Sequence, residues 1–124
     1  MWLNHVHIGV RDLERSMAFY RDTLGLEVSE IPAASMASVQ VGANLSLDLD
    51  HKPDLPDDTP KPVIIGLLVE SADETYAGLK ARGAPLQAEP RDQYWGVRNF
   101  YLSDPDGYTI ECVQPLVKAG GRET

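Results

Sequence analysis

Residues 95–111, with the sequence WGVRNFYLSDPDGYTIE, are the most informative segment of this chain. Strand-type residues flank the tetrapeptide Asp104-Pro105-Asp106-Gly107, which predicts two short strands joined by a tight turn. Pro105 fixes its own φ, and Gly107 accepts a positive φ at little cost. The second strand carries Glu111, and a carboxylate inside a strand is costly unless it has a role. The sequence therefore predicts a rigid hairpin that presents Glu111.

Outward from this hairpin, the chain repeats one order of elements twice. The first half predicts a strand, a helix and three strands, over residues 3–10, 12–25, 27–31, 37–41 and 45–50. The second half predicts the same order, over residues 63–69 and 71–82, a short strand around Leu86, and the hairpin. We expect one domain that consists of a first module 1–50, a Pro-rich linker 51–62, a second module 63–115 and a tail 116–124. Such a repeat indicates duplication.

Length, charge and cysteine usage limit the classes of function. The 124 residues suffice for one compact domain, and no apolar run is long enough to span a bilayer. A net charge of -8 argues against a nucleic-acid partner. The charge fits a neutral or cationic small molecule, and it equally fits a role in solubility. No secretory signal is visible and Cys112 is the only cysteine, so we expect a cytoplasmic protein with a packed, inert thiol.

The first strand carries two histidines on one face. Because side chains alternate along a strand, His5 and His7 point to one side, and Val6, Ile8 and Val10 point to the other. The apolar side predicts a core face. The polar side is a candidate for the wall of a binding site.

Both ends of the chain resemble one family. The opening, with residues 4–16 (NHVHIGVRDLERS) and 19–26 (FYRDTLGL), is similar to that of the vicinal oxygen chelate (VOC) superfamily. The closing residues 94–98 (YWGVR) and 104–107 (DPDG) resemble its closing signature. The superfamily includes glyoxalase I, fosfomycin-resistance enzymes, extradiol dioxygenases, epimerases and bleomycin-resistance proteins.

This resemblance implies an α+β fold. It consists of two tandem βαβββ modules that form curved mixed sheets, with helices on the convex side and a site on the concave side. Modules of such proteins commonly pair between two chains, so a homodimer is implied as the partner, beside a small-molecule ligand.

The resemblance also implies where a metal would bind. Metal-dependent members carry a His early in the first strand, a ligand at the start of the second module and a Glu in the last strand. His5 and Glu111 match the outer positions, but the middle one falls on Ile64, which cannot bind a metal. Strand parity offers Asp48 as a further ligand. Two alternatives stay open: one divalent Fe, Mn, Ni or Zn ion on His5, Asp48 and Glu111, or no metal.

Three further residues of the closing signature are candidates for ligand contacts. Arg98 forms either an ion pair with Glu111 across the hairpin or a clamp for a ligand carboxylate. Tyr94 and Trp95 precede it in a loop, where they suit a stacking wall for a planar ligand. Alternatively, Trp95 caps the site or packs at the dimer interface.

Three functions follow from these residues. Ile64 favours a metal-free protein that sequesters a drug or metabolite. The alternative is a metal-dependent lyase, isomerase, epimerase or dioxygenase that acts on vicinal oxygens, with Glu111 or His7 moving the proton. The third is a metal-free acid–base enzyme that uses His5, His7 and Glu111. The predicted ligand-binding residues are His5, His7, Ile64, Tyr94, Trp95 and Arg98.

Overall fold

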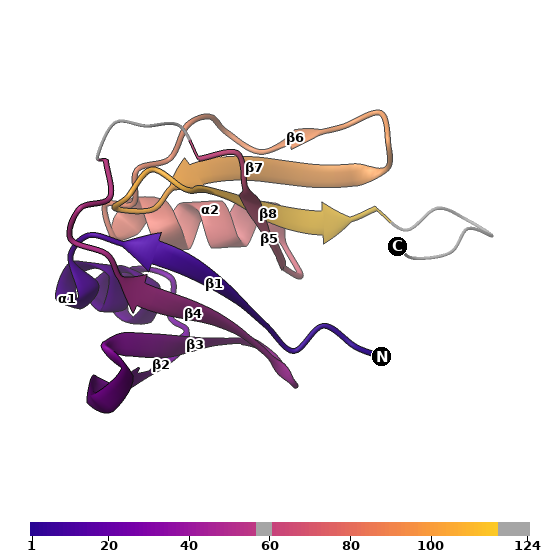
Figure 1. Cartoon of the computed structure of the whole chain (residues 1–124). Helices are drawn as coiled ribbons and strands as arrows, with labels where there is room; N and C mark the ends of the chain where they lie inside the picture. The colour runs from indigo at the N-terminus through magenta and orange to yellow at the C-terminus, as the bar shows by residue number, and fades with distance from the viewer. Residues whose placement is uncertain (57–60, 117–124) are drawn as a thin grey trace. The chain divides into compact units, whose positions relative to one another are not determined.

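The computed structural model describes residues 1–56 and 61–116 (Figure 1). The chain divides into two compact units. The first comprises Met1–Pro60 with Pro105–Gly107, and the second comprises Lys61–Asp104 with Tyr108–Thr124. No helix among the described residues has the length and apolar character that crossing a membrane requires.

The first unit is one four-stranded mixed sheet with a short helical segment on one face. Its elements are β1 (His5–Val10), α1 (Leu13–Ala18), the π-helical turn η1 (Phe19–Thr23), β2 (Glu27–Ile31), the 3₁₀ turn η2 (Pro32–Ala34), β3 (Met36–Gly42) and β4 (Leu45–His51). The strand order is β1-β4-β3-β2, with β1 parallel to β4 and the other pairs antiparallel.

The second unit repeats this topology. Its elements are β5 (Ile64–Leu68), α2 (Ala72–Ala81), β6 (Arg91–Asp92), β7 (Val97–Ser103) and β8 (Thr109–Pro115). The strand order is β5-β8-β7-β6, again with one parallel pair, β5 and β8. The predicted α+β fold of two βαβββ modules with curved mixed sheets is confirmed.

Capping residues explain where the helical segment of the first unit begins and ends, and strand alternation explains which face of its sheet is buried. Asp12 begins α1, where its carboxylate accepts a hydrogen bond from the Arg15 amide at 3.1 Å, and Gly25 ends the helical segment with φ +76°. The apolar face of the sheet is buried together with the helical segment, and its core residues are Ile8, Val10, Met17, Phe19, Tyr20, Ala37, Val39, Leu47 and Leu49. The opposite face of the same strands is therefore left for polar side chains.

The second unit is built the same way. Ser71 caps α2 by accepting a hydrogen bond from the Glu74 amide at 3.1 Å, and the helix packs on β7 and β8. Tyr76 meets Phe100 edge to face with ring centroids 5.4 Å apart. The buried apolar residues on this face are Ala72, Leu79, Phe100, Leu102, Ile110 and Cys112.

The β7–β8 turn forms as its sequence predicts, with Gly107 at φ +88°. Asp106 belongs to the first unit and is only 1% exposed. Its carboxylate accepts hydrogen bonds from the Arg11 amide at 3.0 Å, the Ser16 hydroxyl at 3.2 Å and the Arg15 guanidinium at 3.5 Å. Within the first unit, this buried carboxylate holds residues 105–107 beside the start of α1.

Three local expectations are corrected. The short strand predicted around Leu86 is wrong: Leu86 makes one isolated bridge, to Leu102, and the edge strand is β6. Prolines at 85 and 90 lack the amide N–H that a longer ladder needs. His51, assigned to the linker, is the last residue of β4, and the helix predicted over 12–25 divides into α1 and η1. Residues 117–124 of the predicted tail lie outside the described residues.

Candidate functional site

The helix-free face of the first sheet is polar across three strands. Register pairs His7 of β1 with Asp48 of β4, and Asp48 in turn with Ser38 of β3. Because alternate residues share a face, the polar side chains on this face are His5, His7, Ser38, Gln40, Ser46, Asp48 and Asp50. The opposite face of the same strands is the apolar core.

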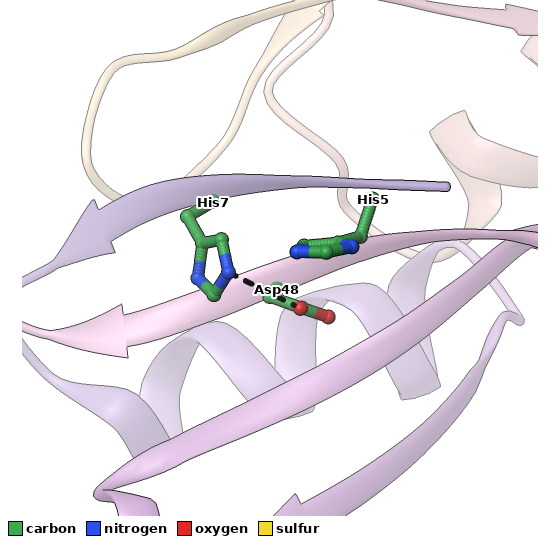
Figure 2. Close-up of side chains that lie close together, drawn as sticks. All are labelled: His5, His7 and Asp48. Atoms are coloured by element: carbon green, nitrogen blue, oxygen red, sulfur yellow. Dashed lines mark ion pairs between the residues drawn. The ribbon is translucent and has the colours of Figure 1, made fainter. Parts of the chain in front are cut away.

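His5, His7 and Asp48 lie together on this face (Figure 2). One ligand atom from each of the three residues lies within 4.8 Å of the other two. The His7 Nε2 atom is 3.6 Å from the Asp48 Oδ2 atom, and the two imidazoles meet edge to face with centroids 5.0 Å apart. Asp48 is 8% exposed, whereas both histidines are open to solvent. We call these three residues the His–His–Asp cluster.

Neighbouring polar groups orient each member of the cluster. The His7 Nδ1 atom lies 3.0 Å from Asp50 Oδ2, and the His5 Nδ1 atom lies 2.8 Å from Asn4 Oδ1. An oxygen acceptor beside Nδ1 places the ring proton there and leaves the lone pair on Nε2. The Ser46 hydroxyl donates to Asp48 Oδ1 at 3.0 Å, so Oδ2 is the oxygen turned toward His7. The cluster can therefore offer two imidazole nitrogens and one carboxylate oxygen.

Glu111 lies on the helix-free face of the second sheet. The buried Asn99 side-chain amide donates to Glu111 Oε2 at 2.7 Å and to the Tyr101 hydroxyl at 3.3 Å. Gln93 Nε2 donates to Asn99 Oδ1 at 2.9 Å. Asn99 is not among the residues predicted from the sequence, although strand alternation places this amide on the face of Glu111. The network fixes one of the two carboxylate oxygens.

Ile64 occupies the start of the second parallel ladder. Ile64 pairs with Thr109, which lies two residues before Glu111, and the residue Ile64 is 61% exposed. In the first unit, His5 begins the equivalent ladder and pairs with Ser46, and Asp48 follows Ser46 by two residues. The duplication thus sets Ile64 at the place of His5 and Glu111 at the place of Asp48.

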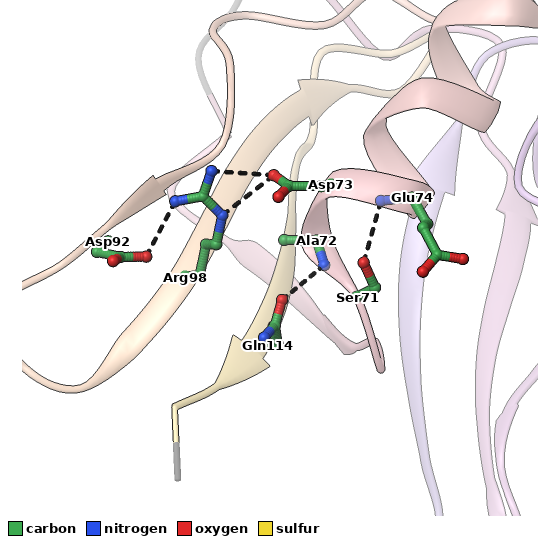
Figure 3. A network of polar contacts seen from close by, with 7 residues as sticks. All are labelled: Ser71, Ala72, Asp73, Glu74, Asp92, Arg98 and Gln114. Carbon is green, nitrogen blue, oxygen red and sulfur yellow. Dashed lines mark hydrogen bonds and ion pairs between the residues drawn. The ribbon is translucent and has the colours of Figure 1, made fainter. Parts of the chain in front are cut away.

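In the β7–β8 register, Glu111 pairs with Tyr101, so these two side chains share a face of the hairpin. Arg98 precedes Tyr101 by three residues, and because side chains alternate along a strand, Arg98 lies on the opposite face. The predicted ion pair between Arg98 and Glu111 is therefore wrong. The guanidinium instead contacts Asp73 of α2 at 3.0 and 3.1 Å and Asp92 of β6 at 3.0 Å (Figure 3). Hydrogen bonds from Arg98 to Asp92 and Asp73 raise the pKa of this guanidinium. The role of Arg98 as a ligand clamp stays a prediction.

Tyr94 and Trp95 are exposed in the loop that joins β6 to β7. Their rings meet edge to face at 4.9 Å, and Gly96 follows them with φ +94°. Such a pair offers aromatic area to a ligand or to a second chain, so the predicted alternatives both stand.

Cys112 is buried in β8. Desolvation, with a smaller contribution from the Glu111 charge, raises the pKa of its thiol to about 11. The thiolate, which is the reactive form, is therefore scarce at neutral pH. The burial and the raised pKa support a packed and unreactive cysteine.

Comparisons with known proteins agree with this fold. The family model described as "Glyoxalase/Bleomycin resistance protein/Dioxygenase superfamily" matches residues 2–112. One similar protein comes from Synechocystis sp. (strain ATCC 27184 / PCC 6803 / Kazusa) and is named as a probable lactoylglutathione lyase. The two sequences are 30% identical over an alignment of 132 positions, which covers 95% of this chain and 98% of that protein.

Two solved structures are similar over nearly their whole length. A glyoxalase/bleomycin resistance protein/dioxygenase from Nocardioides has a TM-score of 0.79 and 25% identity, and the match covers 98% of this chain and 89% of that one. TnmS3, an antibiotic binding protein from Streptomyces sp. CB03234, has a TM-score of 0.75 and 28% identity, with coverage of 93% and 96%.

Proposed function

The chain belongs to the Glyoxalase/Bleomycin resistance protein/Dioxygenase superfamily, and we propose that it binds a small molecule on the polar face of the first sheet. The observation that carries this proposal is the segregation of the sheet into an apolar face and a polar one. Polar side chains on strands need hydrogen-bond partners, and several on this face are accessible to a ligand. His7 is 46% exposed at its side chain and Asp50 is 31% exposed.

The charge of the face favours a particular class of ligand. Asp48 and Asp50 are adjacent carboxylates on β4, and the whole chain carries a net charge of -8. An anionic ligand would be repelled here, whereas a neutral or cationic ligand with hydrogen-bond donors would be attracted. We therefore infer a neutral or cationic ligand.

The metal set that the superfamily resemblance implies does not fit these residues. Ile64 has no donor atom at the second-module position. We therefore infer that ligand binding by this chain does not depend on that set. The similarity to TnmS3, an antibiotic binding protein, supports sequestration of a drug or metabolite.

The proposal is tested by thermal-shift and calorimetric screening of neutral and cationic drugs, bleomycin among them, in buffer that contains EDTA. A ligand that binds only the native state must raise the melting temperature. We expect Asp48→Asn to weaken binding of a hit about tenfold, the loss of one charge-assisted hydrogen bond. The control Asp54→Asn removes an exposed carboxylate outside the face. If no compound binds, or if Asp48→Asn binds as well as Asp54→Asn, the proposal is wrong.

An enzymatic function is the second candidate, and the Synechocystis relative is the observation that favours it. The assay is turnover of S-lactoylglutathione, with and without added Ni²⁺ or Zn²⁺. Turnover that needs the ion supports the metal-dependent alternative. Turnover without it, with a bell-shaped pH profile that Glu111→Gln abolishes, supports acid–base catalysis by His5, His7 and Glu111.

We also propose that the chain forms a homodimer, as the family resemblance implies. The exposed Tyr94 and Trp95 offer the kind of aromatic area that interfaces favour. Light scattering after size exclusion gives the mass directly, and a monomer across the micromolar range would contradict the proposal.

A further inference from the structure

The His–His–Asp cluster carries an inference that goes beyond ligand binding and does not rest on it. We propose that His5, His7 and Asp48 bind one divalent transition-metal ion, through two imidazole Nε2 atoms and one carboxylate oxygen. The site keeps His5 and Asp48, which the family resemblance also implies, and His7 of the same module takes the place of Glu111. Ile64 and Glu111 take no part in it.

The sheet holds the three ligands in place. His7 and Asp48 are direct partners in the parallel β1–β4 ladder, and His5 stands two residues before His7 on the same face. The approach of their ligand atoms to within 4.8 Å requires only small side-chain movements to close around one ion. Sites built on strands keep their geometry better than sites on loops.

An orienting partner stands behind each ligand. Asp50 accepts from His7 Nδ1, and Asn4 accepts from His5 Nδ1, so that each Nε2 lone pair is directed away from its partner. Metal-bound histidines usually have such a partner, which fixes the tautomer and raises the basicity of the ring. Ser46 plays the same part for Asp48. These three contacts are what distinguish the cluster from a chance grouping of polar side chains.

The donor set selects the ion. Two nitrogens and one oxygen suit Zn²⁺, Ni²⁺, Co²⁺ or Cu²⁺, whereas Mg²⁺ and Ca²⁺ prefer oxygen alone. Three protein ligands leave at least one coordination position for water or for an oxygen of a bound molecule. The site would thus place a Lewis acid on the polar face.

Calorimetric titration of the whole chain, freed of metal by dialysis, tests this proposal. Zn²⁺ is expected to bind with a stoichiometry of one, Mg²⁺ is expected not to bind, and Co²⁺ is expected to give a visible d–d absorption. His7→Gln removes a ligand and should weaken Zn²⁺ binding about 100-fold or more, on the order of a lost first-sphere nitrogen. Circular dichroism checks that each variant is folded.

Two matched variants separate this site from its alternatives. His51→Gln removes an exposed histidine outside the cluster and should leave Zn²⁺ binding unchanged. Glu111→Gln should also leave it unchanged, because the proposed site does not use that carboxylate. The proposal is overturned if Zn²⁺ does not bind, if His7→Gln binds as the parent does, or if Glu111→Gln loses as much affinity as His7→Gln. Because the drug screen above runs in EDTA, it can fail or succeed independently of this result.

Discussion

The Nδ1 atom of His7 lies 3.0 Å from a carboxylate oxygen of Asp50, and this contact turns the opposite ring nitrogen toward Asp48. The imidazole of His7 therefore lies between two carboxylates of β4. Asp50 contacts its Nδ1 atom, and Asp48, its partner in the β1–β4 register, faces its Nε2 atom. The proposed metal site starts from this geometry.

Removing the orienting carboxylate should weaken metal binding without removing a ligand. We expect Asp50→Ala to lower the Zn²⁺ affinity about 10- to 100-fold, the usual effect of losing an outer-sphere partner. Asp50→Asn, which keeps an acceptor for the His7 Nδ1–H, should lie between Asp50→Ala and the parent. Competition with a chromophoric chelator measures these affinities. Equal affinities for all three proteins would show that Asp50 does not orient His7.

Asp106 should be the carboxylate on which stability depends most. Asp106→Ala would leave the Arg11 amide and the Ser16 hydroxyl without this acceptor, at a cost of about 2–4 kcal/mol in the free energy of unfolding. Urea denaturation measures the loss. The control is Asp22→Ala, which breaks an exposed pair with Arg21 and should leave the stability close to that of the parent. A similar stability for both variants would contradict the structural role of Asp106.

Cys112 should react slowly with thiol reagents in the folded protein. With a pKa of about 11, roughly one thiol in a thousand is ionised at pH 8, and the side chain is also shielded. Addition of guanidinium chloride should make the reaction with a disulfide reagent complete within seconds to minutes. Rapid reaction of the native protein would show that β8 opens or that the thiol is not desolvated.

The same thiol gives a pH dependence of stability. Its pKa is raised in the folded state from an ordinary 9.0 to about 11, so above pH 9 the unfolded chain loses this proton first. Folding stability contributed by this group should therefore fall as the pH rises from 9 to 11. Urea midpoints across this range, compared with those of Cys112→Ala, measure the effect. The parent should show the steeper decline, and parallel declines would contradict the assignment.

Arg98 should contribute to stability, because its guanidinium contacts two carboxylates. Arg98→Met breaks its contacts with Asp73 of α2 and Asp92 of β6, so we expect a lower melting temperature. Zn²⁺ affinity should not change, because Arg98 is not part of the His–His–Asp cluster. Loss of affinity for a hit from the drug screen would support the ligand-clamp role, and an unchanged melting temperature would contradict the role in stability.

From the sequence, strand alternation predicts which side chains of the site share a face of a strand. It placed His5 and His7 on one face of the first strand, and parity within the fourth strand offered Asp48 as a ligand. The β1–β4 register that brings His7 opposite Asp48 depends on tertiary packing, which no local pattern encodes. The predicted Arg98–Glu111 pair is wrong because the two residues are close across the hairpin but lie on its opposite faces. Strand alternation places Asn99 on the face of Glu111, but the sequence does not distinguish a buried amide in a strand from a polar surface position.

The zinc content of the chain after equilibrium dialysis against a limiting concentration of free Zn²⁺ shows which residues hold the ion. The parent and Glu111→Gln are each predicted to retain about one ion per chain, and His5→Gln, His7→Gln and Asp48→Asn are predicted to retain almost none. Loss of zinc from Glu111→Gln together with its retention by His7→Gln would overturn the proposed site, because it would place the ion on the ligand set that the family resemblance implies.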